Sequence, residues 1–257
     1  MILSLTNVKG GVGKTTTAVN LAASFAGGGL RTLVVDLDPQ SSASFSLGHD
    51  VERRGDGVAE VLLRGKPARE ALYETAVAGL DLLPGSLELA GADLLLARKK
   101  NPYELLWNGL ASVRRSYDMI LVDCPPGLSV LTTNGLAASH AFIVPANPQE
   151  MALEGLHRFF GGFEALSLGR RRPELLGIAL TMVDHRTKVT DDVSRRIRRE
   201  YGRQVFRTEI PINVRLAVAP RYGMPIFSYE GWSTGALAYS RLGAEALRRA
   251  RGPSLAG

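Results

Sequence analysis

Cysteine is almost absent from this chain, because Cys124 is the only one among 257 residues. A single thiol excludes an internal disulfide. It also excludes an iron–sulfur cluster shared by two identical subunits, since four thiolates would require two cysteines per chain. Cys124 lies between an apolar run and Pro125, which favours a buried structural thiol. Aromatic residues make up only 7% of the chain, and we predict that Trp107 and Trp232 serve packing rather than base stacking.

Long apolar runs and clustered histidines are also missing. No apolar stretch approaches the roughly 18 residues of a membrane-spanning helix, and residues 1–7 lack the basic start of a signal peptide. We therefore expect a cytoplasmic protein. The four histidines show no metal-ligand spacing. Because no repeat, low-complexity linker or proline-rich hinge marks a second unit, residues 1–257 are predicted to form one α/β domain.

What the chain does contain is a phosphate-binding loop directly after its first apolar run. In the pattern G-x-x-x-x-G-K-[ST], the first glycine would stand at Val8, and a second lysine follows that residue here. Backbone N–H groups of such a loop hold phosphates, and glycines allow the close approach. The predicted nucleotide-binding residues of the loop are Lys9, Gly10, Gly11, Val12, Gly13, Lys14, Thr15 and Thr16.

The residue types of this loop indicate how a nucleotide would be held. A helix should begin here, so that its N-terminal N–H groups and its dipole face the phosphates. Lys14 would reach the β- and γ-phosphates, and the Thr15 hydroxyl would ligate Mg²⁺. ATP and Mg²⁺ are therefore the expected cofactors. Lys9 has no role in this scheme, because a phosphate-binding loop uses only one of its own lysines to contact the phosphates of its nucleotide.

Two further apolar segments deliver carboxylates. Residues 33–40 are predicted to form a buried strand that ends in Asp36 and Asp38, and an apolar strand from residue 119 delivers Asp123. Open parallel sheets bind ligands at the C-terminal ends of their strands. Asp123 suits Mg²⁺ binding through water. The predicted metal site is Thr15, Asp38 and Asp123, whereas Asp36 is open between a metal role and the capping of backbone N–H groups.

Taken together, these motifs resemble the ParA/Soj family of DNA-partitioning ATPases, within the wider class that includes MinD and the nitrogenase iron protein. The resemblance runs almost end to end, through KGGVGKTTTAVNLA, DLDPQ, YDMILVDCPPGLSVLTTNGL, ALEGL, LTMVDHRT and IPINVRLAVAPRYGMPI. It implies an α/β fold with a doubly wound, mostly parallel sheet flanked by helices. It also implies Mg²⁺-dependent ATP hydrolysis, an ATP-bound homodimer, binding of double-stranded DNA without sequence preference, and a ParB-like DNA-binding partner.

The resemblance assigns a predicted catalytic set, which comprises Lys9, Lys14 and Asp38. Lys9 resembles the lysine that enters the partner subunit's nucleotide site, so that two chains enclose two ATP molecules. A cation supplied in trans in this way acts like an arginine finger. Asp38 matches the family's switch carboxylate, which is thought to position the attacking water. Hydrolysis would then require the dimer.

A C-terminal segment is predicted to bracket the adenine. Pro211 and Asn213 match the family positions with this role, and Asp184 is expected nearby. An asparagine side chain offers both a donor and an acceptor to a purine edge. The chain departs from the family at Ile212, where an arginine is usual, and at residues 217–218, where Ala-Val replaces Ser-Glu. One candidate cation of the nucleotide or DNA surface is therefore absent.

The basic excess lies in the C-terminal part of the chain. Residues from 170 onward contain 17 Lys+Arg against 8 Asp+Glu, whereas residues 1–169 contain 14 against 17. A helix over about 190–201 is predicted to place three arginines away from its apolar stripe. Such cations would bind DNA phosphates and associate the protein with the nucleoid. The predicted DNA contacts are Arg186 and Arg215, from the resemblance, and Arg195, Arg198 and Arg199, from the helix.

Two other function classes remain open from the sequence. A MinD-like membrane-cycling regulator of cell division would need an amphipathic C-terminal helix. Residues 237–251 have several apolar side chains and arginines, but these are more simply the core face of the last helix, and residues 252–257 offer no insertion segment. No membrane partner is therefore expected. A P-loop small-molecule kinase would not require Lys9.

Overall fold

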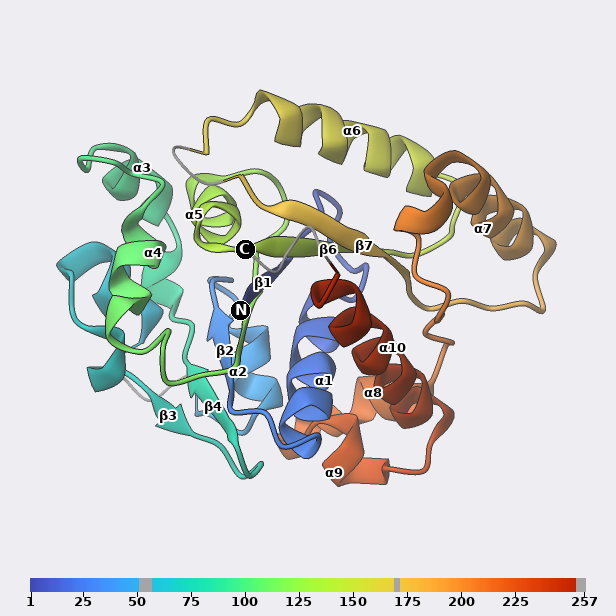
Figure 1. Cartoon of the computed structure of the whole chain (residues 1–257), viewed down its shortest axis with the longest axis horizontal. Helices are drawn as coiled ribbons and strands as arrows, with labels where there is room; N and C mark the ends of the chain where they lie inside the picture. Colours follow the sequence, from blue (N-terminus) through green and yellow to red (C-terminus); the bar gives the residue numbers. More distant parts are fainter. Residues whose placement is uncertain (51–56, 169–171, 253–257) are drawn as a thin grey trace.

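The computed structural model describes residues 1–50, 57–168 and 172–252, and its centre is one seven-stranded sheet (Figure 1). The strands are β1 (Ile2–Leu5), β2 (Thr32–Asp36), β3 (Tyr73–Glu74), β4 (Leu80–Leu83), β5 (Met119–Asp123), β6 (Ala141–Ala146) and β7 (Glu174–Leu180). Their order across the sheet is β3-β4-β2-β5-β1-β6-β7, and only the β3–β4 pair is antiparallel. The predicted mostly parallel sheet is confirmed.

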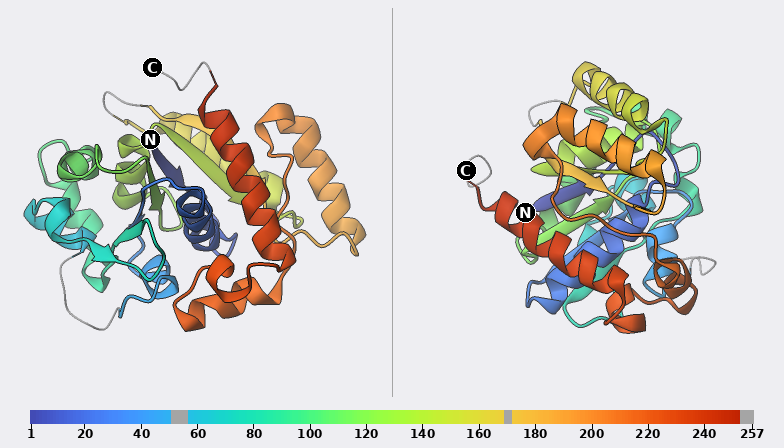
Figure 2. Two further views of the ribbon diagram at one scale, coloured as in Figure 1. Left: turned by 60° about the horizontal axis from the view of Figure 1, so that its bottom comes forward. Right: turned by 90° about the vertical axis from the view of Figure 1, so that its right-hand side faces the viewer.

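Helices cover both faces of this sheet (Figure 2). One face carries α1 (Lys14–Gly27), α2 (Ser42–Ser46), α9 (Ile226–Glu230) and α10 (Thr234–Ala250). The opposite face carries α3 (Ala92–Ala97), α4 (Leu105–Gly109), α5 (Val130–Ala138), α6 (Ala152–Ala165) and α7 (Lys188–Tyr201). The helix α8 (Val214–Val218) precedes α9. Short helical turns are η1 (Glu60–Arg64), η2 (Ala68–Glu70), η3 (Leu87–Leu89), η4 (Leu110–Ser112), η5 (Gly202–Gln204) and η6 (Ala219–Tyr222).

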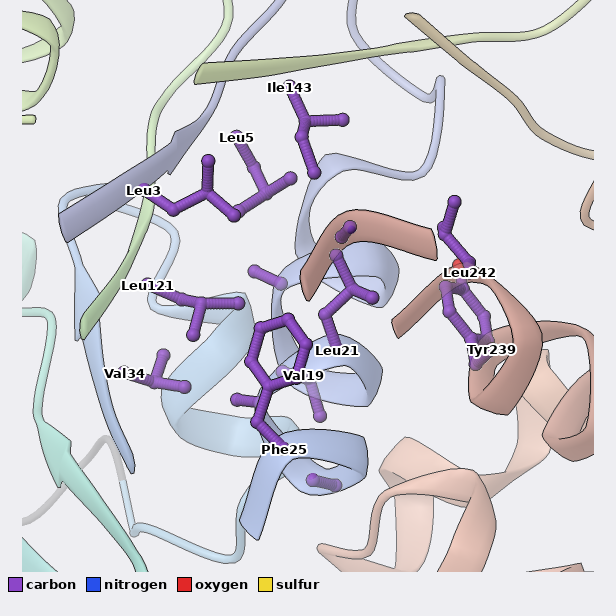
Figure 3. Close-up of a cluster of buried hydrophobic side chains, with 14 of the residues drawn as sticks. Leu3, Leu5, Val19, Leu21, Phe25, Val34, Leu121, Ile143, Tyr239 and Leu242 are labelled. Carbon is purple, nitrogen blue, oxygen red and sulfur yellow. The ribbon is translucent and has the colours of Figure 1, made fainter. Parts of the chain in front are cut away.

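Alternate residues of each strand enter different halves of the core. Leu3 and Leu5 of β1 pack towards α1 and α10, as Figure 3 shows, whereas Ile2 belongs to the cluster on the opposite face. All four residues of β1 are buried, because helices exclude water from both sides. The hydroxyl groups of Thr17 and Tyr239 lie 3.1 Å apart and link α1 to α10.

The topology gathers three strand ends at one edge. β1 lies between β5 and β6, and β5 also pairs with β2. The register places Leu5 opposite Asp123 and Asp123 opposite Asp36, so the end of β1 and two carboxylates are neighbours. The phosphate-binding loop follows β1 directly. The predicted ligand edge is therefore built from strands that are far apart in sequence.

Several predicted boundaries differ from the structure. β2 ends at Asp36 rather than continuing to residue 40, because Ser41 N donates to Asp38 O over 2.8 Å and closes a turn. Residues 73–74 form the antiparallel edge strand β3, which was not predicted from the sequence, and residues 51–56 lie outside the described part. The helix predicted at 190–201 begins at Lys188.

The two tryptophans differ from each other. Trp107 packs against a buried cluster and against the Arg114 guanidinium, 4.1 Å from its ring centre, whereas Trp232 is 92% exposed between α9 and α10. The packing prediction is therefore wrong for Trp232. Cys124 is buried as predicted, and burial raises the pKa of its thiol.

Most of the apolar face of the last helix is buried in the core. In α10, Tyr239 and Leu242 are buried against α1, whereas Leu237 is 44% exposed. Among the described residues, no helix has both the length and the apolar character needed to cross a bilayer. Residues 253–257, most of the tail considered above, lie outside the described chain.

Candidate nucleotide-binding site

The loop after β1 has the backbone of an anion cradle. Gly11 and Gly13 adopt φ angles of 69° and 81°, which residues with a Cβ rarely adopt. Gly13 is also the N-cap of α1, and no side chain caps this helix end or places an acidic group in its first turn. The first N–H groups of α1 and the positive end of its dipole therefore remain available to an anion.

Two polar side chains outside the motif hold this loop in place. Asn7 Oδ1 accepts a hydrogen bond from Lys9 N over 3.1 Å, and its Nδ2 donates to Pro145 O over 2.8 Å. Thr181 Oγ1, just after β7, donates to Val12 O over 2.9 Å. Neither Asn7 nor Thr181 was predicted from the sequence. The role of Asn7 could have been predicted, because it is a polar residue between an apolar strand and the glycine loop. No local sequence pattern indicated the role of Thr181.

The two lysines of the loop occupy different environments. Lys14 is only 7% exposed, and its Nζ donates to Lys9 O over 3.0 Å. Burial lowers the pKa of Lys14, and the charge of Asp123 partly offsets this effect. The Lys9 side chain is exposed. The loop thus directs one lysine inwards and leaves the other available to a second molecule.

Asp123 is paired on one side only. Thr15 Oγ1 donates to Asp123 Oδ2 over 2.7 Å, whereas Asp123 Oδ1 is buried without a hydrogen-bond partner. Burial, followed by the charge of Asp36, raises the pKa of Asp123 well above its usual value. A buried oxygen without a partner fits a cation or its bound water. No group of three or more His, Cys, Asp or Glu side chains suited to a metal occurs within residues 1–50, 57–168 and 172–252.

The other two carboxylates of this edge have distinct roles. Asp36 is fully buried and accepts bonds from Ser44 N at 2.8 Å, Ser44 Oγ at 2.7 Å and Asp38 N at 3.1 Å. These contacts match the capping alternative. Burial raises the pKa of Asp36 to about 6, although the bonds from Ser44 lower it. Asp38 is half-buried and accepts a bond from Gln40 N over 2.9 Å.

A cavity of about 1070 Å³ brings the predicted residues together. Its floor is the glycine loop with Lys14, Thr15 and Thr16, and Asp38 lies at one side. Lys9, Val12 and Asp123 are outside the lining, although Asp123 contacts Thr15. The opposite wall contains Ile210, Pro211, Ile212, Asn213, Val214 and Leu216. The cavity also has lining residues that were not predicted from the sequence, among them Phe45, Pro126, Asn147, Gln149, Met182 and Tyr239.

The wall around Pro211 is anchored to the end of the sheet. Pro211 forms a parallel bridge with Val183, and Ile212 N donates to Val183 O over 3.2 Å. The Asn213 side chain makes two hydrogen bonds within the protein that the sequence did not predict. Its Oδ1 accepts from Arg215 N and caps α8, and its Nδ2 donates to Thr234 Oγ1, both over 2.8 Å. Each of these atoms keeps one further bonding position for a ligand.

The two arginines assigned by resemblance are paired with acids at the surface. Arg186 forms a two-bonded pair with Asp184 at 2.7 and 2.8 Å, and Asp184 lies outside the cavity lining in the described chain. Arg215 Nε lies 2.8 Å from Glu230 Oε2. Their side chains are 84% and 54% exposed, so both remain accessible to a large anion.

The three arginines of α7 are not equivalent. Arg195 pairs with Asp192 at the surface, and Arg199 is exposed. Arg198 is half-buried and donates to Phe206 O over 2.9 Å and to Glu209 over 2.7 Å. Of the three arginines predicted to point away from the apolar stripe, Arg198 is the least accessible, because its guanidinium joins α7 to the segment before Pro211.

The chain has extensive similarity to known proteins. Residues 1–172 match a family model described as an AAA domain. The chromosome-partitioning ATPase Soj of Thermus thermophilus is 43% identical over 248 residues, covering 96% of this chain and 95% of that protein. The chromosome partitioning protein ParA of Myxococcus xanthus is 39% identical over 250 residues, with coverages of 96% and 88%. The solved structure of cobyrinic acid a,c-diamide synthase from Mycobacterium smegmatis with bound ADP and magnesium has a TM-score of 0.82 at 34% identity, with coverages of 96% and 94%.

Proposed function

This chain belongs to the ParA/Soj family of partitioning ATPases, and on that premise we propose that it is an ATP-dependent dimerisation switch acting on DNA. Residues 1–257 would work as one ATPase domain. ATP and Mg²⁺ close a homodimer, the closed dimer binds double-stranded DNA without sequence preference, and a ParB-like partner stimulates hydrolysis and release. The protein would then act in the cytoplasm at the nucleoid, moving or positioning DNA.

The observation that carries this proposal is the single cavity that joins the glycine loop, Asp38 and the Pro211–Asn213 wall. The uncapped start of α1 and Lys14 supply positive charge at one end, where phosphates would lie. The apolar side chains near Pro211 suit a purine at the other end. The ADP and magnesium bound by the similar Mycobacterium smegmatis protein support ATP and Mg²⁺ as cofactors here.

The residues around Thr15 fit a magnesium ion. The Thr15 hydroxyl would ligate it, and Asp123, with its unpartnered Oδ1, would hold it through water. Bound Mg²⁺ would neutralise charge on the β- and γ-phosphates. Asp38, half-buried at the cavity, would orient the attacking water. Asp38 lies in the turn after β2 and lines the cavity.

Lys9 supports the dimer part of the proposal. Its side chain is exposed although its carbonyl is bonded to Lys14 of the same loop. A lysine so placed can reach the nucleotide of a facing subunit, where it would stabilise charge that develops during hydrolysis. ATP would drive closure because γ-phosphate contacts differ between the open and closed states. DNA would be held by exposed arginines, with Arg186 and Arg215 first among them.

Asp38→Ala tests the switch directly. Removing the water-orienting carboxylate should slow hydrolysis while leaving the phosphate contacts intact, so the variant should accumulate as an ATP-bound dimer that retains DNA. Sedimentation with ATP and Mg²⁺, followed by DNA binding at fixed salt, measures both properties. Glu70→Ala removes an exposed carboxylate outside the cavity and should behave as wild type. A monomeric Asp38→Ala protein that hydrolyses ATP at the wild-type rate would refute the proposed switch.

A further inference from the structure

A second large cavity lies between the end of α7 and α10, which cover opposite faces of the sheet and approach each other at its β7 edge (Figure 2). Its volume is about 1070 Å³, and none of its lining residues also lines the nucleotide cavity. Six of the eleven lining residues are arginines, against one acid. The lining consists of Arg198, Gly202, Arg203, Val205, Arg207, Thr208, Arg241, Ala244, Glu245, Arg248 and Arg249.

Two of these arginines are occupied by the fold itself. Arg198 is bonded to Glu209 and to a backbone carbonyl, as described above. Arg249 donates to Leu176 O over 3.0 Å and to Val205 O over 2.9 Å, and its guanidinium stacks 4.1 Å from the centre of the Phe206 ring. These contacts explain two of the six cations as parts of the scaffold.

The other four arginines are exposed and have no acidic partner within the described part of the chain. Arg241 and Arg248 are seven residues apart on α10 and therefore share one face of the helix. Arg203 and Arg207 come from the segment that follows α7. Two separate elements thus direct unpaired guanidinium groups to one hollow, where like charges repel unless an anion joins them.

The single acid of the lining does not neutralise these four groups. Glu245 is 7% exposed and accepts bonds from Arg207 N at 2.9 Å, Thr208 N at 3.0 Å, Thr208 Oγ1 at 2.9 Å and Arg249 at 2.9 Å. Burial raises the pKa of Glu245, but these donors outweigh it and hold the pKa below its usual value. Its negative charge is therefore satisfied within the scaffold.

We propose that this arginine cavity is a second anion site, which binds phosphate groups of either a DNA backbone or a free oligophosphate. One guanidinium group can donate two parallel hydrogen bonds to two oxygens of a phosphate. Four guanidinium groups on two walls of the cavity therefore suit several linked phosphates better than one isolated anion. The inference does not rest on the proposed ATPase switch, because it uses no residue of the nucleotide cavity. A neighbouring hollow of about 580 Å³, lined by Arg207, Arg241 and Pro211, lies between the two sites.

Calorimetry with tripolyphosphate tests the site without assuming its natural ligand. The measured proteins are wild type, the double variant Arg241→Gln/Arg248→Gln, and the control Arg98→Gln/Arg115→Gln, which removes two exposed arginines outside both cavities. ADP and Mg²⁺ are present throughout, and Lys14→Ala is measured separately to expose any binding at the glycine loop. We expect the cavity variant to weaken binding by about tenfold or more, and the control and Lys14→Ala to retain it.

A short DNA duplex distinguishes the two sources of phosphate. It is titrated, with ATP and Mg²⁺, into the parent, the cavity variant and the control variant, each carrying Asp38→Ala to hold the dimer closed. A loss of duplex affinity in the cavity variant, relative to the control variant, identifies the DNA backbone as the ligand. A loss confined to tripolyphosphate identifies a free oligophosphate. Binding of both probes by the cavity variant as tightly as by the control variant overturns the proposal. Because Lys14→Ala affects only the nucleotide cavity, failure of the ATPase switch and failure of this site give different results.

Discussion

Thr15 Oγ1, at the start of α1, donates a hydrogen bond to Asp123 Oδ2, at the end of β5, over 2.7 Å. The second oxygen of the same carboxylate is buried and unpartnered. A hydroxyl that follows the glycine loop is thereby joined to a carboxylate on a neighbouring strand, with one acceptor position left over. Under the proposed function, this one contact would link phosphate binding to metal binding.

Asp123→Asn should weaken nucleotide binding only when Mg²⁺ is present. The change preserves shape but removes the charge that would hold the hydrated ion, so we expect ATP affinity in Mg²⁺ to fall about tenfold and affinity in EDTA to change little. Titration of a fluorescent ATP analogue under both conditions measures this. Thr15→Ser keeps the hydroxyl and serves as the matched control. Equal losses with and without Mg²⁺ would contradict a metal role for Asp123.

The two lysines of the loop should have separable effects. Lys14→Ala deletes the buried charge facing the cavity and should abolish nucleotide binding. Lys9→Ala should leave ATP affinity nearly unchanged but remove ATP-dependent dimerisation and lower turnover, by up to the roughly 10³ to 10⁵ known for cations supplied in trans. Equilibrium binding, sedimentation and phosphate release measure the three properties. A dimer with normal hydrolysis in Lys9→Ala would show that the exposed lysine has no role in trans.

The buried Asp36 carboxylate should make stability depend on pH. Its folded pKa of about 6 exceeds the ordinary value of 3.8, so the folded state binds more protons between these values. The free energy of unfolding of the Mg²⁺-free protein should therefore fall as pH rises from about 4 to about 6, and should level off above that. Asp123, whose pKa is also raised, adds a change of the same sign.

Urea unfolding across this pH range, with Asp36→Asn beside wild type, tests that dependence. The variant should show a shallower slope, because one of the two contributing carboxylates is gone. Asp184→Asn is the control: the Arg186 side chain lowers the pKa of Asp184 to about 2, so its contribution is lost only as pH falls below the ordinary value. If the free energy of unfolding of Asp36→Asn depends on pH as steeply as that of wild type, Asp36 is not a source of the pH dependence.

DNA affinity should depend on salt through Arg186 and Arg215. If each contacts one phosphate per subunit, removing either from a two-fold dimer deletes two contacts. The slope of log affinity against log salt should then become shallower by about 2, similarly for two unrelated duplexes. Binding isotherms in the Asp38→Ala background measure this slope. Glu230→Gln, which releases Arg215 from its acid, should bind DNA at least as tightly as the parent. Unchanged slopes for both arginine variants would place the DNA elsewhere.

The sequence by itself determined the parts of the site that local chemistry specifies. Gly11 and Gly13 could be assigned to a phosphate loop because their positive φ angles are a backbone property of glycine. Asp36 and Asp123 could be assigned to strand ends because each follows an uninterrupted apolar run. A doubly covered parallel sheet follows from such runs, since both faces of each strand must be buried.

Only the tertiary structure decided how side chains distant in sequence share their hydrogen bonds. It joined the Asn213 amide to Thr234 and the Arg198 guanidinium to Glu209, and it left Trp232 in solvent. It also brought residues 203–207 and 241–248 around one arginine-lined cavity. These outcomes depend on how α7 and α10 pack, because a charged or amide side chain bonds to whatever partner packing places within about 3 Å, and no local pattern encodes that partner.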